Sequence, residues 1–518
     1  MVMPGSDVAE MLPETDNHVR LPAPRSHSRH NACARPHHGG KPLGKVALRA
    51  LRFLHHFSCR NAVYGASERF ENAQSCANIL GVPNESRAGF LSRGSGEAMA
   101  IEGFSEDAFK AVLRENFTPS NSIKTPERLF GRDKALKQID RALASQGRQV
   151  FIYGDRGVGK TSVALTAAYM LNDSSEDPLY VACGESDNFA DAIASIGNAC
   201  IPIEKRMEEV GAGPEFGATI LGIGGSFKAG KKAQARVQPP KSLNDALDIL
   251  RFVLKKRQGM IVVVIDEMER LPKKEREKFA EVIKNLPELD DRLKFIFCGI
   301  ATTVNELLGS HPSAGRILET IPLERLHHNF LWDIIKVVGD KAGVSVAHET
   351  LVRISQISDG FPHYVHLIGA SMFWSVFDDE AVIARIERQH FKAGVSGAID
   401  GAEAILRHQY EKATMKTKNT EDYEDALWAL ADRTLDRRQM NDIFEQSYPK
   451  IVSGRRRAPL ERKTFNHRML ALRKESHASI VVGFGSGWFG FRENIMRGYV
   501  RLQAEKAGIE LGRDGSMT

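Results

Sequence analysis

The stretch QVFIYGDRGVGKTSVALTAA, residues 149–168, decides the fold. Four apolar or aromatic residues at 150–153 have the pattern of a short buried strand, and the Ala-rich run after Lys160 has that of a helix. Between them stands GDRGVGKT (154–161), which fits the spacing GxxxxGK followed by Ser or Thr. Glycines let consecutive backbone N–H groups turn toward an anion, and the helix adds its positive N-terminal end. The stretch therefore predicts a phosphate-binding loop between a strand and a helix.

We expect the whole loop to contact a nucleotide, with ATP and Mg²⁺ as the cofactors. Lys160 is expected to reach the β- and γ-phosphates as a point charge, and the Thr161 hydroxyl is expected to ligate Mg²⁺. The predicted nucleotide-binding residues of this loop are Gly154, Asp155, Arg156, Gly157, Val158, Gly159, Lys160, Thr161 and Ser162.

A second element, MIVVVIDEMERL at 260–271, supports the first. Five consecutive apolar residues at 261–265 suit a central parallel strand. At its end, Asp266 is expected to hold Mg²⁺ and Glu267 to polarise a water for attack on the γ-phosphate. Further strands are predicted at 179–182 and 293–301, with helical patterns between the strands. Helical crossovers between buried strands predict an α/β fold with a doubly wound parallel sheet.

Three further segments resemble those of AAA+ ATPases, in particular the origin-recognition-like and STAND-type branches. RLFGR (128–132) resembles the adenine-side box of that family, DEMERL (266–271) its acidic strand motif, and residues 298–326 its sensor 1 and arginine-finger region. The resemblance implies that Gly131 and Arg132 lie beside the nucleotide base. It also implies that Thr302, where the family usually has Asn, is the sensor residue. Arg316 then contacts the γ-phosphate bound to a neighbouring subunit of an ATP-dependent homo-oligomer, although a surface arginine is an equal alternative.

The segment GFPHYV (360–365) resembles the GxP motif that opens the lid helix in STAND-like ATPases. The resemblance implies that Pro362 and His363 contact the nucleotide. Many AAA+ proteins carry a sensor 2 arginine near this point, and this sequence does not. His363 is either a substitute for that arginine or a packing residue, and the missing arginine favours slow ATP hydrolysis.

The C-terminal region has the pattern of a winged helix. Helices are predicted at 423–430, 437–444 and 460–472, followed by two strands around a glycine turn at 478–491. Residues 450–501 hold 12 Lys and Arg against three Glu, so this region is locally basic. The third helix of a winged helix can enter the major groove, and the basic charge suits phosphates, so both features favour duplex DNA as the partner. The alternative is that this region docks a protein. The DNA-binding candidates are Arg455, Arg456, Arg457, Lys463, Asn466, Arg468, Arg473 and Lys474.

These patterns divide the 518 residues into five parts. Residues 1–98 are predicted to be disordered or not translated in the cell, since Gly96-Glu97-Ala98 precedes a candidate start at Met99. A helix over 101–117 and a linker fill 99–124. The ATPase core, the helical lid and the winged-helix domain are predicted at 125–325, 326–415 and 416–510. Scattered cysteines and the absence of an 18-residue apolar run predict a cytoplasmic protein without a membrane partner.

Two functions fit this organisation. The first is an ATP-dependent regulator associated with DNA, of the replication or transposition type. The alternative is a STAND-type signalling or defence switch, in which the winged helix docks protein and a separate effector is activated. A separate effector or transposase is the expected protein partner, because no nuclease, protease or transferase motif is found in the chain.

Overall fold

A computed structural model describes residues 104–172, 176–203, 236–300, 314–415 and 418–513, together with Arg206 and the short strands at 209–210 and 233–234. The predictions for residues 1–98, for Met99 as the start and for Thr302 lie outside this described part. All of the description that follows concerns the unit formed by Ser95–Thr518.

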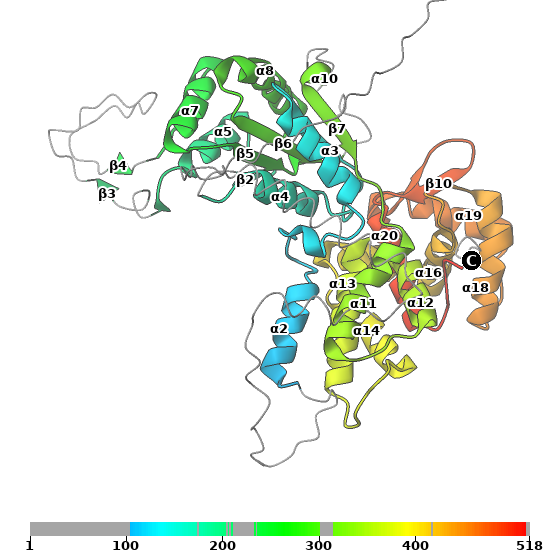
Figure 1. The fold of residues 1–518 in the computed structure, drawn as a ribbon. Helices are drawn as coiled ribbons and strands as arrows, with labels where there is room; N and C mark the ends of the chain where they lie inside the picture. The colour runs from blue at the N-terminus through cyan, green and yellow to red at the C-terminus, as the bar shows by residue number, and fades with distance from the viewer. Residues whose placement is uncertain are drawn as a thin grey trace, which may run out of the picture. The chain divides into compact units, whose positions relative to one another are not determined.

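A five-stranded sheet lies at the centre of the ATPase core (Figure 1). Its strand order is β2-β5-β6-β1-β7, and every neighbouring pair is parallel. The predicted parallel α/β sheet is therefore confirmed. The strands are β1 (Gln149–Tyr153), β2 (Leu179–Ala182), β5 (Ile261–Asp266), β6 (Leu293–Gly299) and β7 (Leu318–Pro322). The last of these was not predicted from the sequence.

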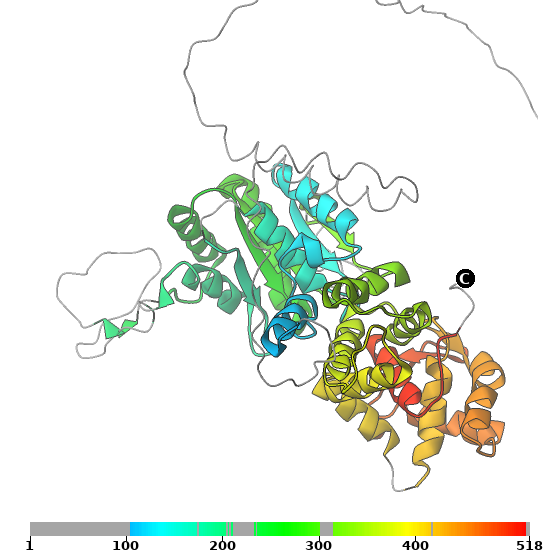
Figure 2. The same cartoon turned by 60° about the horizontal axis from the view of Figure 1, so that its bottom comes forward.

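Alternate residues of the central strands face two different hydrophobic cores, one on each side of the sheet. On β5, Val262 and Val264 face one core, while Val263 and Ile265 face the other. This alternation follows from the two-residue period of a strand. Helices therefore cover both faces of the sheet (Figure 2). One face carries α3 (Asp133–Ala144) and α4 (Lys160–Leu171), and the other carries α5 (Phe189–Asn198), α7 (Leu243–Lys256) and α8 (Lys273–Leu289).

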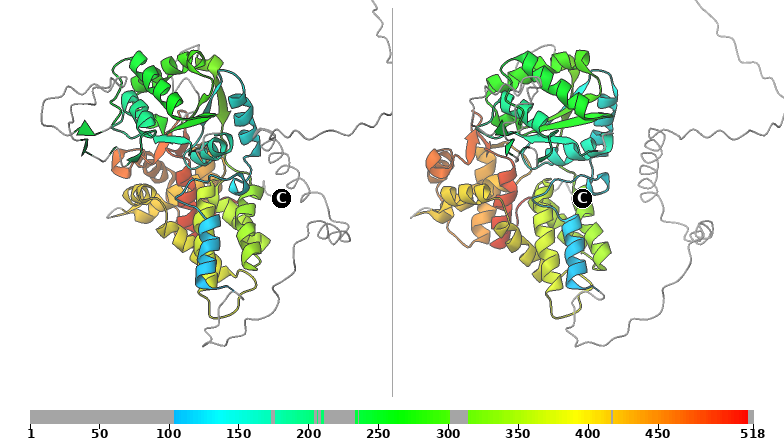
Figure 3. Two further views of the ribbon diagram at one scale, coloured as in Figure 1. Left: turned by 60° about the vertical axis from the view of Figure 1, so that its left-hand side comes forward. Right: turned by 90° about the vertical axis from the view of Figure 1, so that its left-hand side faces the viewer.

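A group of helices follows the core and spans the segment predicted to be the lid, so we call this group the lid. These helices are α11 (His328–Ala342), α12 (His348–Ser358), α13 (Pro362–Phe377), α14 (Arg388–Asp400) and α15 (Ala404–Thr414). Helix α2 (Glu106–Asn116) lies along this group (Figure 3). The Phe109 ring of α2 stacks on Phe377 with centroids 4.7 Å apart and meets Trp374 edge-on at 5.6 Å. The helix predicted at 101–117 is thus present and is part of the lid.

The C-terminal region combines helices with a three-stranded antiparallel sheet of order β8-β10-β9. Its elements are α16 (Thr420–Ala431), β8 (Arg438–Gln439), α17 (Met440–Asp442), a π-helical turn η4 (Ile443–Ser447), α18 (Tyr448–Gly454), α19 (Arg462–Ala471), β9 (Val481–Gly483), β10 (Trp488–Phe491) and α20 (Ile495–Lys506). The helix predicted at 437–444 is wrong in its bounds. That segment begins as strand β8, and the second full helix is α18, because Arg438 pairs with Phe489 of β10.

Shorter elements complete the description. These are the 3-10 turns η2 (Pro126–Arg128), η3 (Met268–Arg270) and η5 (Glu475–His477), the helix α10 (Ala314–Ile317), and the antiparallel pair β3 (Glu209–Val210) and β4 (Ala233–Gln234). Within the described ranges, we find no helix with the length and apolarity that a membrane span requires.

Candidate functional site

The phosphate-binding loop joins β1 to α4 at the carboxyl end of the sheet. Strand β1 lies between the central strand β6 and the edge strand β7, so the loop leaves the sheet from an interior strand. Gly159 is the N-cap of α4 and has φ 94°, a left-handed conformation that favours glycine. The first N–H groups of α4 therefore follow directly from the loop and are available to an anion. This arrangement is the one that the sequence predicts.

Lys160 lies within the loop at the start of α4. Its Nζ donates hydrogen bonds to the backbone oxygens of Asp155 (2.8 Å) and Gly154 (3.2 Å). Burial lowers the pKa of Lys160, and the carboxylates of Glu269 and Asp266 oppose this shift. An ammonium ion held by neutral carbonyls in a partly dry site is well placed to exchange them for phosphate oxygens.

Thr161 and Asp266 meet directly across the sheet edge. The Thr161 hydroxyl donates to Asp266 Oδ2 over 2.6 Å, and the Asp266 side chain is almost fully buried. A hydroxyl and a carboxylate are hard oxygen ligands of the kind that Mg²⁺ selects, usually together with water and phosphate oxygens. The two predicted metal ligands are thus adjacent, and they fit the ion.

Tyr180 of β2 also contacts Asp266, which the sequence did not predict. Its hydroxyl donates to Asp266 Oδ2 over 3.2 Å, so two hydroxyls hold one carboxylate oxygen. Burial raises the pKa of Tyr180, and the negative charge of Asp266 raises it further. The phenol therefore stays protonated and orients the carboxylate.

Glu267 has an unusual backbone for a residue with a side chain. Its φ and ψ are 56° and 38°, in the left-handed region, and its N–H donates to Asp266 Oδ1 over 2.9 Å. Its carboxylate pairs with Arg270 at 3.1 Å. Burial raises the pKa of Glu267, while Arg270 opposes the shift. Such a conformation costs about 1–3 kcal/mol, and Glu267 lines a cavity next to the phosphate-binding loop.

Gly131 and Arg132 connect the adenine-side box to the loop. Arg132 is 7% exposed, and its guanidinium donates to the Val158 oxygen over 2.8 Å. Burial lowers the pKa of Arg132 to about 10, although Glu324 opposes the shift. Gly131 packs against Phe330 of the lid, since a Cβ at this position would lie 2.5 Å from that ring. Arg132 thus contacts the loop, and the implied position of both residues beside the nucleotide base stays a prediction.

A cavity of about 660 Å³ brings these groups together. This volume is in the usual range for a small-molecule site. The cavity is lined by the loop from Arg156 to Ser162, by Asp266, Glu267 and Glu269, by Phe130 and Arg132, by Pro362, His363 and His366 of the lid, and by residues 118–123.

Residues 118–123 form an N-terminal arm across this cavity. The Ile123 N–H donates to Ser162 Oγ over 3.1 Å, and the Thr166 hydroxyl donates to the Ile123 oxygen over 3.0 Å. At the other end, His363 Nδ1 lies 3.1 Å from the Pro119 oxygen. This wall of the cavity was not predicted, because the arm contains no recognisable motif.

The contact of His363 with the N-terminal arm fits the packing alternative, and its role at the nucleotide stays a prediction. A carbonyl only accepts, so Nδ1 carries the proton that it donates to the Pro119 oxygen. Burial lowers the pKa of His363, and its Nε2 is buried without a partner in the described structure. A neutral imidazole fixed in this way does not supply the positive charge of a sensor 2 arginine.

Arg316 lies outside the cavity. It is exposed at the end of α10, just before the edge strand β7. An exposed arginine at this edge is compatible with a contact to a second subunit, so its role stays a prediction.

Several DNA-binding candidates are engaged by acidic residues of α16. Arg455 pairs with Asp425 at 2.9 Å and with Glu424 at 3.0 Å. Arg457 contacts Asp425, and both Arg457 and Arg468 lie 3.0 Å from Asp422. Burial raises the pKa of Asp425, although Arg455 and Arg457 oppose the shift.

The remaining candidates lie on α19 or next to it in the chain. Arg456, Lys463, Arg473 and Lys474 are exposed, while Asn466 is half-buried and its Oδ1 is buried without a partner in the described structure. Seven of the eight candidates thus separate into an exposed group of four and a group of three that pairs with α16, and Asn466 belongs to neither.

Fold, loop and cavity together define a P-loop nucleotide-binding ATPase domain, and comparison with known proteins specifies it further. Residues 128–296 match the model of the AAA ATPase domain. This part of the chain is therefore an AAA ATPase domain, in agreement with the resemblance seen in the sequence. A search of curated proteins found no match.

Several solved structures are similar to this chain at low identity. The Walker-type ATPase of Pyrococcus abyssi is 14% identical, with 74% of this chain and 99% of that chain covered and a TM-score of 0.43. Cdc6p from Pyrobaculum aerophilum is 15% identical, with 75% and 98% covered and a TM-score of 0.40. The RuvB Holliday junction branch migration motor of Thermotoga maritima is 15% identical, with 75% and 98% covered and a TM-score of 0.37.

Proposed function

We propose that this protein is an ATP-hydrolysing switch. The observation that carries the proposal is the convergence of Lys160, the Thr161–Asp266 pair and Glu267 on one cavity behind the adenine-side box. Each of these groups meets a separate need of phosphoryl transfer, and together they leave room for a nucleotide.

In this proposal the reaction is an in-line attack of water on the γ-phosphate. Lys160 stabilises charge on the β- and γ-phosphate oxygens, and Glu267 accepts a hydrogen bond from the attacking water and orients it. Mg²⁺, held by Thr161 and Asp266, supplies positive charge to the phosphate oxygens. Arg316 is proposed to reach the γ-phosphate of a second copy, so that ATP lies between subunits of a homo-oligomer.

Two substitutions test the ATPase. Lys160→Ala should weaken ATP binding at least tenfold, because it removes the charge that meets the phosphates. Glu267→Gln should bind ATP as the wild type does and hydrolyse it about 100-fold more slowly, because the water is no longer oriented. Binding is measured by calorimetry and turnover by phosphate release. Wild-type turnover in Glu267→Gln would assign the water to another residue.

The proposed role of the C-terminal region is contact with duplex DNA, by a winged-helix domain whose third helix is α19. Its support is the local excess of basic residues over 450–501 and the exposure of Arg456, Lys463, Arg473 and Lys474. Replacement of these four side chains by Gln should flatten the slope of log K against log salt by about four units if all contact phosphate. Absence of binding at low salt would remove DNA from the proposal.

The second candidate is a signalling switch whose C-terminal region docks a protein. The pairing of Arg455, Arg457 and Arg468 with α16 favours it, because these arginines stabilise the fold instead of facing a partner. Replacement of the four exposed side chains separates the two candidates, because it should change DNA affinity only under the first. A triple replacement of Arg455, Arg457 and Arg468 by Gln is the control, and it should lower stability under both.

A further inference from the structure

The hairpin of β9 and β10 carries two exposed aromatic side chains. Phe484 is 44% exposed and Trp488 is 38% exposed, although large apolar side chains are usually buried. The register that pairs Gly483 with Phe489 places Phe484 opposite Trp488, and the Phe484 N–H donates to the Trp488 oxygen over 2.9 Å. Residues opposite each other in an antiparallel pair point to the same side of the ribbon. The two rings therefore lie on one side of the hairpin, while Phe489 and Phe491 are buried on the other.

The backbone of the hairpin is shaped to hold the Phe484 ring. The three turn residues 485–487 have φ of 85°, 46° and 77°, all in the left-handed region. A Cβ at Gly490 would lie 3.1 Å from Cε2 of Phe484 and 2.4 Å from the Asp436 oxygen, so a larger residue would leave no room for the ring. The ring is thus in place before any partner arrives, and binding does not need to order it.

Two arginines border the hairpin. The Arg437 guanidinium lies over the Phe484 ring, 4.0 Å from its centroid. A Cβ at Gly483 would lie 2.9 Å from the guanidinium carbon of Arg473, so that side chain lies against β9. Both arginines are exposed, and residues 476–492 contain no acidic side chain. The surface around the rings is therefore positively charged.

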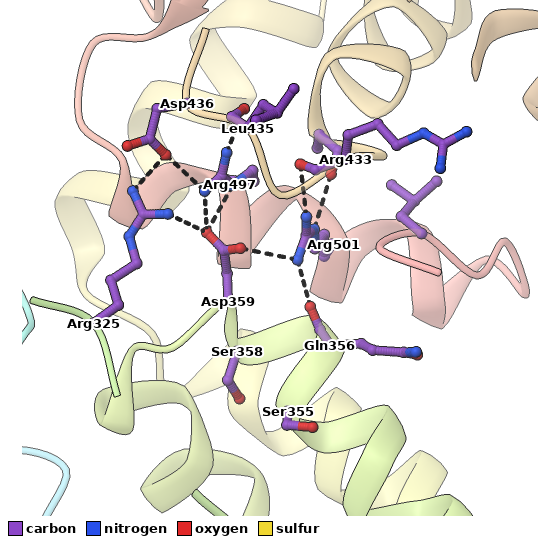
Figure 4. Close-up of polar contacts among 12 residues, drawn as sticks. Arg325, Ser355, Gln356, Ser358, Asp359, Arg433, Leu435, Asp436, Arg497 and Arg501 are labelled. Atoms are coloured by element: carbon purple, nitrogen blue, oxygen red, sulfur yellow. Dashed lines mark hydrogen bonds and ion pairs between the residues drawn. The ribbon is translucent and has the colours of Figure 1, made fainter. Parts of the chain in front are cut away.

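Asp436, the residue before Arg437, is paired inside the molecule. It lies 2.6 Å from Arg325 and 2.8 Å from Arg497 (Figure 4). Arg497 also donates to the Leu435 oxygen over 2.7 Å. The segment that carries Arg437 is therefore fixed by α20, and the charge of Asp436 is balanced by arginines other than Arg437.

Aromatic rings beside arginines suit a strand of nucleic acid whose bases are unpaired. Every base has a π face that stacks on Phe or Trp, and the phosphates attract Arg. In a duplex the π faces are covered by neighbouring base pairs, so only unpaired bases offer them. A neutral protein surface would cover the rings but would give the arginines no counter-charge. The chemistry of the hairpin therefore favours a polyanion with free aromatic faces.

We propose that the β9–β10 hairpin binds unpaired bases of single-stranded DNA, with Phe484 and Trp488 stacking on bases and Arg437 facing a phosphate. This goes beyond the proposed contact with duplex DNA, which depends on charged side chains on and next to α19 and needs no unpaired base. The two contacts are compatible where a duplex adjoins a single strand.

The test measures binding of the full chain to a labelled thymidine oligonucleotide and to a duplex of the same length, by fluorescence anisotropy. Phe484→Leu and Trp488→Leu should each weaken binding of the single strand about tenfold, because leucine stays apolar and has no π face. Binding of the duplex should stay within twofold of the wild type. Leu435→Ala is the matched control, because Leu435 is 65% exposed near the hairpin and cannot stack, so its affinities should equal those of the wild type.

An oligonucleotide with abasic sites separates stacking from charge, because it keeps the phosphates and lacks the bases. The wild type should bind it about as weakly as the Phe484→Leu/Trp488→Leu variant binds the normal strand. The normal strand should also quench tryptophan fluorescence in the wild type and not in Trp488→Leu.

Three outcomes would count against the proposal. Single-strand affinities within twofold of the wild type in both single variants would overturn it, and so would an equal loss of affinity for the abasic strand in these variants. Binding of the duplex but not of the single strand would overturn this inference and leave the duplex contact standing. Binding of neither would overturn both.

Discussion

Asp359 holds the junction between the lid and the C-terminal region, so replacing it by Asn is a direct test of that junction. Its carboxylate lies 2.6 Å from the guanidinium of Arg497 and 3.2 Å from those of Arg325 and Arg501. The side chains of Asp359, Arg497 and Arg501 are 3%, 2% and 0% exposed. Asp359 has φ 52°, and Asn tolerates this left-handed conformation, so the substitution removes the charge without straining the backbone.

The expected loss of stability is about 3 kcal/mol. Breaking a buried ion pair by removing one partner costs about 3–5 kcal/mol. The lower end applies, because Arg497 and Arg501 keep hydrogen bonds to the backbone oxygens of Leu435 and Ala431, and Arg497 also keeps its contact with Asp436. The matched control is Asp248→Asn, whose partner Arg251 is 53% exposed at 2.6 Å. An exposed pair of this kind contributes less than about 1 kcal/mol.

Native-state hydrogen exchange at α20 is the suitable assay, because a chain with several domains has no single unfolding midpoint. The free energy of opening at α20 should fall by about 3 kcal/mol in Asp359→Asn and by less than about 1 kcal/mol in Asp248→Asn. Equal, small losses in the two variants would refute the reasoning, since they would mean that the buried charge does not hold α20.

Three more expectations follow from single contacts. Burial lowers the pKa of His366 to about 4, so the unfolded chain binds the proton of this imidazole more tightly than the folded chain does. The free energy of unfolding should therefore fall as the pH drops from 6.5 to 4. In acid titrations followed by fluorescence, His366→Phe should reduce the number of protons taken up on unfolding by up to one. Phe109→Ala should lower the free energy of opening at α2 by about 3–5 kcal/mol in native-state hydrogen exchange, because the ring is fully buried against Trp374; a change below about 1 kcal/mol would show that α2 does not stabilise the lid. Tyr180→Phe removes a hydrogen bond to Asp266 worth about 1 kcal/mol, so nucleotide binding should need about fivefold more Mg²⁺, and an unchanged Mg²⁺ titration would exclude a positioning role.

The features predicted correctly from the sequence depend on short stretches of chain. Strand, loop and helix around Lys160 follow one another within 149–168, and Asp266 ends a strand that is apolar throughout, so local pattern was sufficient. Strand β7 was missed because it is a short edge strand in which only Leu318 and Ile321 are buried, without the alternation that marks a half-buried strand. The pattern of a short stretch cannot show which distant residue will lie beside that stretch in the folded chain.

Long-range pairing explains the other differences. Arg455 and Arg457 looked like a patch for phosphates, but their partners on α16 stand about thirty residues earlier in the chain. Similarly, Glu403 and Glu493 contact Arg156 across 247 and 337 positions, and neither belongs to a motif. Charges that neutralise one another only after folding are visible in a structure and not in a composition.

The N-terminal arm has a practical consequence for anyone who expresses part of this protein. The family match begins at residue 128, yet Ile123 contacts Ser162 and Thr166, and Pro119 contacts His363. A fragment trimmed to the homology boundary would lose one wall of its own ligand cavity, together with the helix that anchors that wall to the lid. Weak nucleotide binding by such a fragment would then reflect the position of the cut and not the chemistry of the site.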